Sequence, residues 1–177
     1  TLAKKYNGEI LSVDSRQVYR GMDIGTGKVA GTLHRVPCSC HPELSQGLPA
    51  GRQGSLRSGR DDNAVYIYKS IPHYGIDIAS PKTQYSVAQF QKYAKKIIKD
   101  IHGRGKLPIL CGGTGHWIDA VVLEQQMPQV KPNPALRKKL EKLNTTQLFA
   151  KLAKLDPQRA QTIDAKNPRR LIRALEI

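Results

Sequence analysis

A strand–helix–strand pattern over residues 75–111 constrains the fold of this chain more than any other feature. Its last part, Leu107–Cys111, is an almost wholly apolar run, which suits a strand buried on both faces of a parallel sheet. Gly75–Ile78 is a weaker candidate for the first strand. A helix is predicted between them, because Ser86 and Gln89 form a capping box and apolar residues follow at helical spacing: Val87, Phe90, Ala94, Ile97, Ile98 and Ile101. The pattern therefore predicts an α/β fold with a right-handed crossover.

Two polar segments directly follow predicted strands. Asp14–Gln17 come after a β-rich run at residues 9–13, and Gly112–Gly115 come after the apolar run that ends at Cys111. Ligands of open α/β sheets bind at the carboxyl ends of the strands. We therefore expect these two segments to converge on a functional site.

The chain divides by composition into a core and a smaller helical part. Residues 1–127 hold the predicted strands, interrupted by a loop-rich insertion at about 30–71 that ends in a possible short strand, Val65–Tyr68. After residue 128 no strand is predicted. Helices are expected instead at four signals, three of them a cap followed by proline: Asn133-Pro134, Thr145 or Thr146, Asp156-Pro157 and Asn167-Pro168. Residues 128–177 are therefore predicted to form an appended helical lobe.

Both ends of the chain are predicted to be helical. Thr1–Gly8 is typical of the last turns of a helix, with Leu2, Ala3 and Tyr6 on one face and a left-handed residue supplied by Asn7-Gly8. The last residues, 171–177, predict a helix without a C-cap. We therefore expect the sequence to be an internal piece of a longer protein.

The charge of the chain is strongly positive. The 29 Lys and Arg residues against 14 Asp and Glu give a formal charge of +15 and a pI near 9.9. Such a domain commonly has a polyanionic partner such as nucleic acid, although a highly charged soluble surface explains the same composition. No apolar run approaches the ~20 residues of a bilayer-spanning helix, so we expect no membrane partner. Three cysteines and the lack of a signal peptide predict a reducing, intracellular location.

The cysteines themselves offer little chemistry. Cys38, Cys40 and His41, with His34 nearby, match none of the usual zinc-ligand spacings, so we predict no metal site there. Cys111 lies within an apolar strand and is expected to be a small core residue.

Three features could carry chemistry, and each has a plainer explanation. Asp14 could accept a proton from a substrate amine, or it could cap its own turn. The Gly112–Gly115 turn, with the Thr114 hydroxyl, could admit a ligand close to the backbone, or it could be a tight strand-to-helix turn. Three arginines near the start of the last helix could grip phosphates or form a solvated helix face: Arg169, Arg170 and Arg173.

Several segments together resemble the tRNA dimethylallyltransferase family, in order and in spacing. The resemblance covers nearly the whole chain apart from the insertion at 30–71. The segments are Gly8–Ile10, Asp14–Thr26, Pro72–His73 through Asp77–Ile78, Tyr85–Phe90, Leu107–Leu110 with Gly112–Gly115, and Asn167–Glu176.

The resemblance implies a fold and an activity. The family has a P-loop NTPase-like α/β core with a helical tRNA-binding lobe, and it moves a dimethylallyl group from dimethylallyl diphosphate to N6 of the adenine 3′ to the tRNA anticodon. Asp14 is implied as the general base. The residues implied to bind tRNA are Ser15, Arg16, Gln17, Thr114, Arg137, Arg169, Arg170, Leu171, Ile172 and Arg173. Mg²⁺ and a P-loop are implied to hold the diphosphate. A cytoplasmic, monomeric enzyme acting on the anticodon stem-loop is expected.

The sequence also departs from the family pattern. The P-loop signature G-x-x-x-x-G-K-[ST] is absent, and Gly25-Thr26-Gly27-Lys28 lacks both its spacing and a preceding strand. The P-loop would precede Thr1, so the chain alone is expected to be inactive. Three other functions remain open: prenylation of free AMP or ATP, a P-loop kinase of small molecules, and a basic RNA-binding module without activity.

Overall fold

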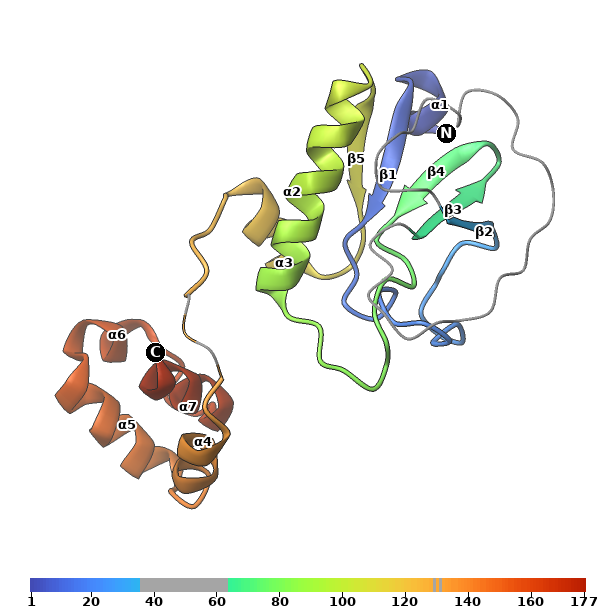
Figure 1. Cartoon of the computed structure of the whole chain (residues 1–177). Helices are drawn as coiled ribbons and strands as arrows, with labels where there is room; N and C mark the ends of the chain where they lie inside the picture. The colour runs from blue at the N-terminus through green and yellow to red at the C-terminus, as the bar shows by residue number, and fades with distance from the viewer. Residues whose placement is uncertain (36–63, 129, 131) are drawn as a thin grey trace. The chain divides into compact units, whose positions relative to one another are not determined.

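The computed structural model describes residues 1–35, 64–128, 130 and 132–177 (Figure 1). The chain divides into two compact units, Thr1–Gln126 and Met127–Ile177. No helix within the described ranges is long and apolar enough to cross a membrane.

The first unit is built on one mixed five-stranded sheet. Its strand order is β2-β3-β4-β1-β5, in which β1 pairs in parallel with both β4 and β5, whereas β2, β3 and β4 pair antiparallel. The strands are β1 Gly8–Ser12, β2 Thr32–Arg35, β3 Ala64–Tyr68, β4 Ile71–Tyr74 and β5 Leu107–Cys111. The predicted α/β class is confirmed, and the chain connects the parallel strands β4 and β5 through a long helix.

The strand predicted at residues 75–78 is wrong by a few positions, because β4 ends at Tyr74. Gly75 and Asp77 both have positive φ, 80° and 56°, and a left-handed residue cannot continue an extended strand. Residues 75–78 instead carry the chain away from the sheet. Asp77 thereby lies beside the loop after β1, where its backbone N–H donates to the Gln17 carbonyl at 3.0 Å.

The predicted insertion at 30–71 is not loop throughout. Its first residues form strand β2, and its last residues form strand β3 and the start of strand β4. The short strand expected at Val65–Tyr68 is therefore confirmed. The loop-rich part between them lies outside the described residues.

Helix α2, Val87–Gly103, forms as predicted and packs on the sheet (Figure 1). The capping box of Ser86 and Gln89 is present, and the predicted apolar stripe faces the core. Phe90 stacks on Trp117 of helix α3, Gly115–Val122, with ring centroids 4.4 Å apart. The core of this unit therefore lies between the sheet and these two helices.

Strand β5 is less buried than its apolar sequence predicts. It is the edge strand of the sheet, and both Leu107 and Cys111 are exposed. The expected core position of Cys111 is therefore wrong, because an apolar run cannot distinguish a central strand from an edge strand.

At the amino end, α1 is a single turn, Leu2–Lys5, and Asn7 adopts a left-handed conformation with φ of 49°, as predicted. Of the expected apolar face only Ala3 is buried, whereas Leu2 and Tyr6 are exposed.

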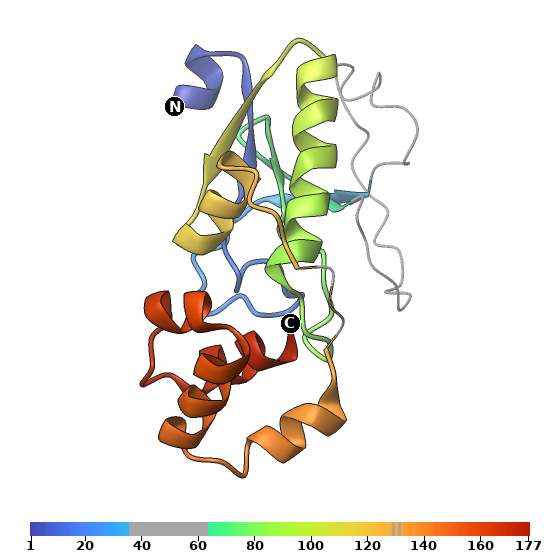
Figure 2. The same ribbon diagram turned by 90° about the vertical axis from the view of Figure 1, so that its left-hand side faces the viewer.

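The described residues of the second unit form four short helices (Figure 2). Each begins at a side-chain cap, Asn133, Asn144, Asp156 or Asn167, and three of the four have proline in the first turn. The helices are α4 Pro134–Leu140, α5 Thr145–Leu155, α6 Pro157–Thr162 and α7 Pro168–Glu176. A separate small core joins them: Leu140, Leu148, Leu152, Ala160, Leu171 and Ile172.

Candidate functional site

The carboxyl ends of β1 and β5 lie in close backbone contact at Gly112. A Cβ on Gly112 would lie 2.2 Å from the backbone oxygen of Val13, so no side chain fits at this position. The N–H of Thr114 donates to the same Val13 oxygen at 3.2 Å, and the Val13 N–H donates to Cys111 at 2.8 Å. The convergence of the two polar segments, predicted from their places after strands, is confirmed.

Thr114 joins these two segments directly. Its hydroxyl oxygen accepts a hydrogen bond from the backbone N–H of Ser15 at 2.9 Å, and it lies 3.2 Å from the Ser15 hydroxyl. Both side chains are partly exposed. Two hydroxyls are thereby held at the surface of the site.

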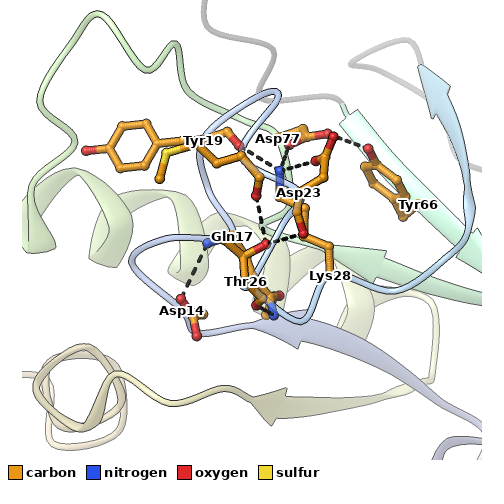
Figure 3. Close-up of polar contacts among 10 residues, drawn as sticks. Asp14, Gln17, Tyr19, Asp23, Thr26, Lys28, Tyr66 and Asp77 are labelled. Atoms are coloured by element: carbon orange, nitrogen blue, oxygen red, sulfur yellow. Dashed lines mark hydrogen bonds and ion pairs between the residues drawn. The ribbon is translucent and has the colours of Figure 1, made fainter.

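Asp14 is buried at the base of this turn, at the end of β1. Its Oδ1 accepts hydrogen bonds from the backbone N–H of Arg16 at 2.8 Å and of Gln17 at 3.4 Å. Figure 3 shows the second of these bonds. The interpretation of Asp14 as a turn cap is therefore correct for one oxygen. Oδ2 lies toward the glycine turn, 3.6 Å from where a Cβ on Gly113 would be. It has no hydrogen-bond donor among the described residues, so a polar group of a ligand could approach it.

Arg16 and Gln17 behave differently. The Arg16 side chain is 67% exposed, and its Nε lies 3.9 Å from Asp14, so it can reach a ligand. Each end of the Gln17 amide is bonded within the protein: its Oε1 accepts from Ser12 Oγ at 2.7 Å, and its Nε2 donates to the Thr26 carbonyl at 2.9 Å. In this structure Gln17 holds the loop together, and its amide does not point to solvent.

An ion-pair cluster around the buried Lys28 side chain, beside the turn, was not predicted from the sequence. Lys28 reaches Asp77, Asp23 and the backbone oxygen of Tyr19, and Tyr66 donates to the other oxygen of Asp77 (Figure 3). Lys28 stood out in the sequence only because its segment superficially resembles a P-loop. Its partner Asp77 is 49 positions away, so no local pattern links the two residues.

In the second unit, Arg137 and Arg173 both bind one buried carboxylate. Glu176 accepts a bidentate pair from Arg137 at 2.8 and 2.7 Å and a bond from Arg173 at 2.5 Å, and it also accepts the Asn133 backbone N–H. The Arg137 guanidinium, followed by the Asn133 N–H and Arg173, lowers the pKa of Glu176 to about 2. The two arginines remain about one third exposed. Their charges are therefore partly compensated inside the unit.

The other residues of the last helix divide by burial. Arg169 and Arg170 are exposed at its start, whereas Leu171 and Ile172 belong to the core of the second unit. The buried side chains of Leu171 and Ile172 cannot reach an external partner. Within residues 169–173, only the arginine side chains are therefore available to an external partner.

Metal ligands are not gathered in the part of the chain that the structure describes. No group of three His, Cys, Asp or Glu side chains lies together there. Mg²⁺ commonly takes only one or two carboxylates and fills its shell with substrate phosphates, so we assign it no residue of this chain. The Cys38–His41 segment lies outside the described residues.

The fold and the site define a class: an α/β protein with a polar site at the carboxyl ends of parallel strands and a separate basic helical unit. A model of the IPP transferase family matches residues 63–177. The chain therefore belongs to the IPP transferase family.

Two relatives are similar over nearly the whole chain. A tRNA dimethylallyltransferase of Roseiflexus sp. (strain RS-1) is 41% identical over 180 residues, covering 99% of this chain and 48% of the relative. A tRNA dimethylallyltransferase of Anoxybacillus flavithermus (strain DSM 21510 / WK1) is 39% identical over 176 residues, covering 99% and 46%. The chain thus spans about half the length of the curated relatives it matches.

One solved structure supports the fold. The structure of a eukaryotic dimethylallyltransferase acting on tRNA is 24% identical and has a TM-score of 0.62, covering 99% of this chain and 36% of that chain. The described architecture is therefore that of a known dimethylallyltransferase.

Proposed function

We propose that the protein, in its full natural length, is a tRNA dimethylallyltransferase. It transfers a dimethylallyl group from dimethylallyl diphosphate to N6 of the adenine 3′-adjacent to the tRNA anticodon. The observation that carries the proposal is the Asp14 carboxylate, buried at the end of β1 and facing the Gly112–Thr114 turn, in a chain of the IPP transferase family. The relatives named above bear the same activity in their names.

Asp14 is the general base of the proposed reaction. The adenine N6 attacks C1 of the dimethylallyl group, a C–N bond forms, and the C1–O bond breaks with its electron pair leaving on the diphosphate. The proton lost by N6 passes to Oδ2 of Asp14, the oxygen that the turn does not use. An exocyclic amine is inaccessible in a stacked helix, so the adenine must be extruded into the site.

The neighbouring side chains have distinct proposed roles toward the extruded adenosine. Arg16 is exposed enough to contact a phosphate or the base, and Ser15 and Thr114 offer hydroxyls at the site surface. Gln17 supports the loop, because both ends of its amide are already bonded. In this proposal the side chains of Ser15, Arg16 and Thr114 contact the nucleotide, and that of Gln17 does not.

The second unit supports a contact with the tRNA backbone. Arg169 and Arg170 are exposed near the start of α7, and the chain as a whole carries a formal charge of +15. Exposed guanidiniums bind phosphates and release counterions, so this contact gives affinity without base readout. Arg137 and Arg173 contribute their remaining exposed edges, since Glu176 takes part of their hydrogen-bonding capacity.

Mg²⁺ belongs to the proposal as the ion that accompanies the diphosphate. When bound, it would neutralise charge that develops on the leaving group. We also propose that the protein is monomeric and located in the cytoplasm, where its tRNA substrate is found.

A product assay tests the proposed function. The full-length protein is incubated with dimethylallyl diphosphate, Mg²⁺ and unmodified tRNA, and the nucleosides are analysed by mass spectrometry. We expect one dimethylallyl group on the adenine next to the anticodon. An equal rate on free AMP, with no preference for tRNA, would contradict the proposal and favour an adenylate prenyltransferase. Phosphate transfer from ATP to a small hydroxyl compound would favour a kinase.

A further inference from the structure

Lys28 is a buried cation bound to three residues on two segments of the first unit. Its side chain is only 5% exposed, and its Nζ lies 2.8 Å from the Tyr19 oxygen, 2.8 Å from Asp23 Oδ1 and 2.6 Å from Asp77 Oδ1. An ammonium has three hydrogens to donate, so these partners satisfy it completely. Lys28 therefore has no donor left for a substrate, and its effect must pass through the residues that it holds.

Asp77 is held from two sides in a rarely adopted backbone conformation. Its φ is 56°, in the left-handed region that Asp tolerates better than most residues. Lys28 binds one carboxylate oxygen, and the Tyr66 hydroxyl donates to the other (Figure 3). Burial, followed by the bond to Asp77, raises the pKa of Tyr66, so this phenol stays protonated and remains a donor. These contacts fix Asp77 beside the turn at Asp14–Gln17.

The two segments that Lys28 joins, the loop at residues 19–26 and the turn at Asp77, both form hydrogen bonds with Gln17. The backbone N–H of Asp77 donates to the Gln17 carbonyl at 3.0 Å. On the other side, the Gln17 amide donates to the Thr26 carbonyl at 2.9 Å, and the Thr26 hydroxyl ties the same loop to Met22 at 2.7 Å. Thr26 is itself buried. Gln17 is therefore hydrogen-bonded on both sides, through its backbone to Asp77 and through its side chain to Thr26, and Lys28 connects these two segments.

Gln17 in turn holds the carboxylate of Asp14. Its backbone N–H is one of the two that bind Oδ1, the Arg16 N–H being the other. With Oδ1 fixed, the direction of Oδ2 toward the glycine turn is fixed as well. The orientation of the proposed base thus depends on contacts that begin at a residue 14 positions away in the sequence.

We propose that Lys28 is a positioning residue for the transfer reaction: through Asp77, Thr26 and Gln17 it aims the free oxygen of Asp14. The inference rests on the proposed function and adds to it a residue that touches neither substrate nor reacting atoms. A misplacement of a base by about 1 Å can lower a rate by roughly a hundredfold, so loss of this clamp should act on turnover.

The test is Lys28→Met in the full-length protein, with steady-state transfer measured on tRNA. Methionine retains the apolar length of the side chain and removes the ammonium. We expect kcat to fall about 10- to 100-fold, with KM for tRNA within about twofold of wild type, because base orientation changes and tRNA contacts do not. Lys28→Arg, which keeps the charge, should recover part of the loss. Lys99→Met, an exposed lysine on α2, is the matched control and should match wild type.

A double variant distinguishes positioning from general damage. Asp77→Asn keeps a residue that tolerates positive φ and removes the charge that faces Lys28. If both residues act through the same path, Lys28→Met with Asp77→Asn should lose no more than the worse single variant. Losses that multiply would overturn the inference.

The outcomes are separable from those of the proposed function. All rates are normalised to the folded fraction, read from far-UV circular dichroism of each variant. An active wild type with unchanged kcat in Lys28→Met, or with a change in KM alone, overturns the positioning role but leaves the proposed function standing. An inactive wild type overturns both. If Lys28→Met does not fold, Asp77→Asn decides by the same measurement of kcat.

Discussion

The Thr114 hydroxyl accepts the backbone N–H of Ser15 at 2.9 Å, across 99 positions of sequence. This bond joins the loop after β5 to the loop after β1. Gly112 makes the approach possible, since any side chain there would collide with Val13. The close approach of these two loops therefore depends on one hydroxyl and one glycine.

We expect Thr114→Val to destabilise the first unit by about 1–2 kcal/mol and to lower prenyl transfer, because the Ser15 N–H loses its partner in an isosteric change. The measurement is urea unfolding followed by far-UV circular dichroism, together with the product assay. Thr114→Ser keeps the hydroxyl and should remain close to wild type. Equal stability of the valine and serine variants would show that the bond contributes little.

Asp14→Asn should lower kcat by about a hundredfold or more, as expected for the loss of a positioned base. Asparagine keeps an oxygen for the Arg16 and Gln17 N–H groups, so the turn should persist. The affinity for tRNA, measured by filter binding, should change little. Asp119→Asn, an exposed position on α3, serves as the control. Normal turnover of Asp14→Asn would remove Asp14 from the mechanism.

Arg170→Gln should weaken tRNA binding uniformly across tRNA sequences and reduce the slope of log K against log salt by about one, since one phosphate contact is lost. The side chain is exposed and forms no ion pair with the described residues, so stability should hold. The measurement is tRNA affinity at several salt concentrations. Arg159→Gln on α6 offers a matched exposed arginine. An unchanged salt dependence in Arg170→Gln would exclude the phosphate contact.

The second unit should lose stability in acid through Glu176. The pKa of its carboxyl falls from an ordinary value of 4.5 to about 2 on folding. A depressed pKa gives stability that is present above the unfolded value and lost as pH falls through the folded value, here from about pH 4 toward pH 2. Amide hydrogen exchange of peptides from α5 and α7, followed across this range in the full-length protein, measures the loss.

Glu176→Gln should remove this acid step and lower the stability of the second unit at neutral pH. Arg137 and Arg173 would lose their charged partner, at a cost of about 2 kcal/mol for hydrogen bonds to a charged group. Protection of α5 and α7 at pH 7 should fall accordingly. An acid step of wild-type size in the glutamine variant would assign the titration to another group.

Local sequence chemistry determined much of this protein. Capping boxes and proline signals mark where α2 and the second-unit helices begin, because these rules act within one turn of the chain. The placement of polar segments after strands also predicted that Asp14–Gln17 and Gly112–Gly115 converge, since parallel strand ends share one edge of a sheet. The resemblance to the family named the same residues independently.

Partners distant in sequence were decided only by the tertiary structure. Glu9 lies in β1 and is fully buried; burial raises the pKa of its carboxyl, but hydrogen bonds from Arg104, Lys106 and Tyr74 outweigh it and leave the pKa lowered. Arg104 and Lys106 are 95 and 97 positions away from it. No local pattern predicts such a buried carboxylate, and the same holds for the pairing of Lys28 with Asp77.

Burial likewise depended on the assembled fold. The apolar run of β5 predicted a central strand, yet Cys111 is exposed, because position within the sheet is set by which strands pair. The resemblance implied that Arg137 and Arg173 bind tRNA, and the structure shows that both bind Glu176. The sequence alone determined which segments are helix or strand and which polar residues follow a strand, because these depend on neighbours along the chain. Only the tertiary structure decided which charges are paired and which side chains remain available, because these depend on neighbours in space.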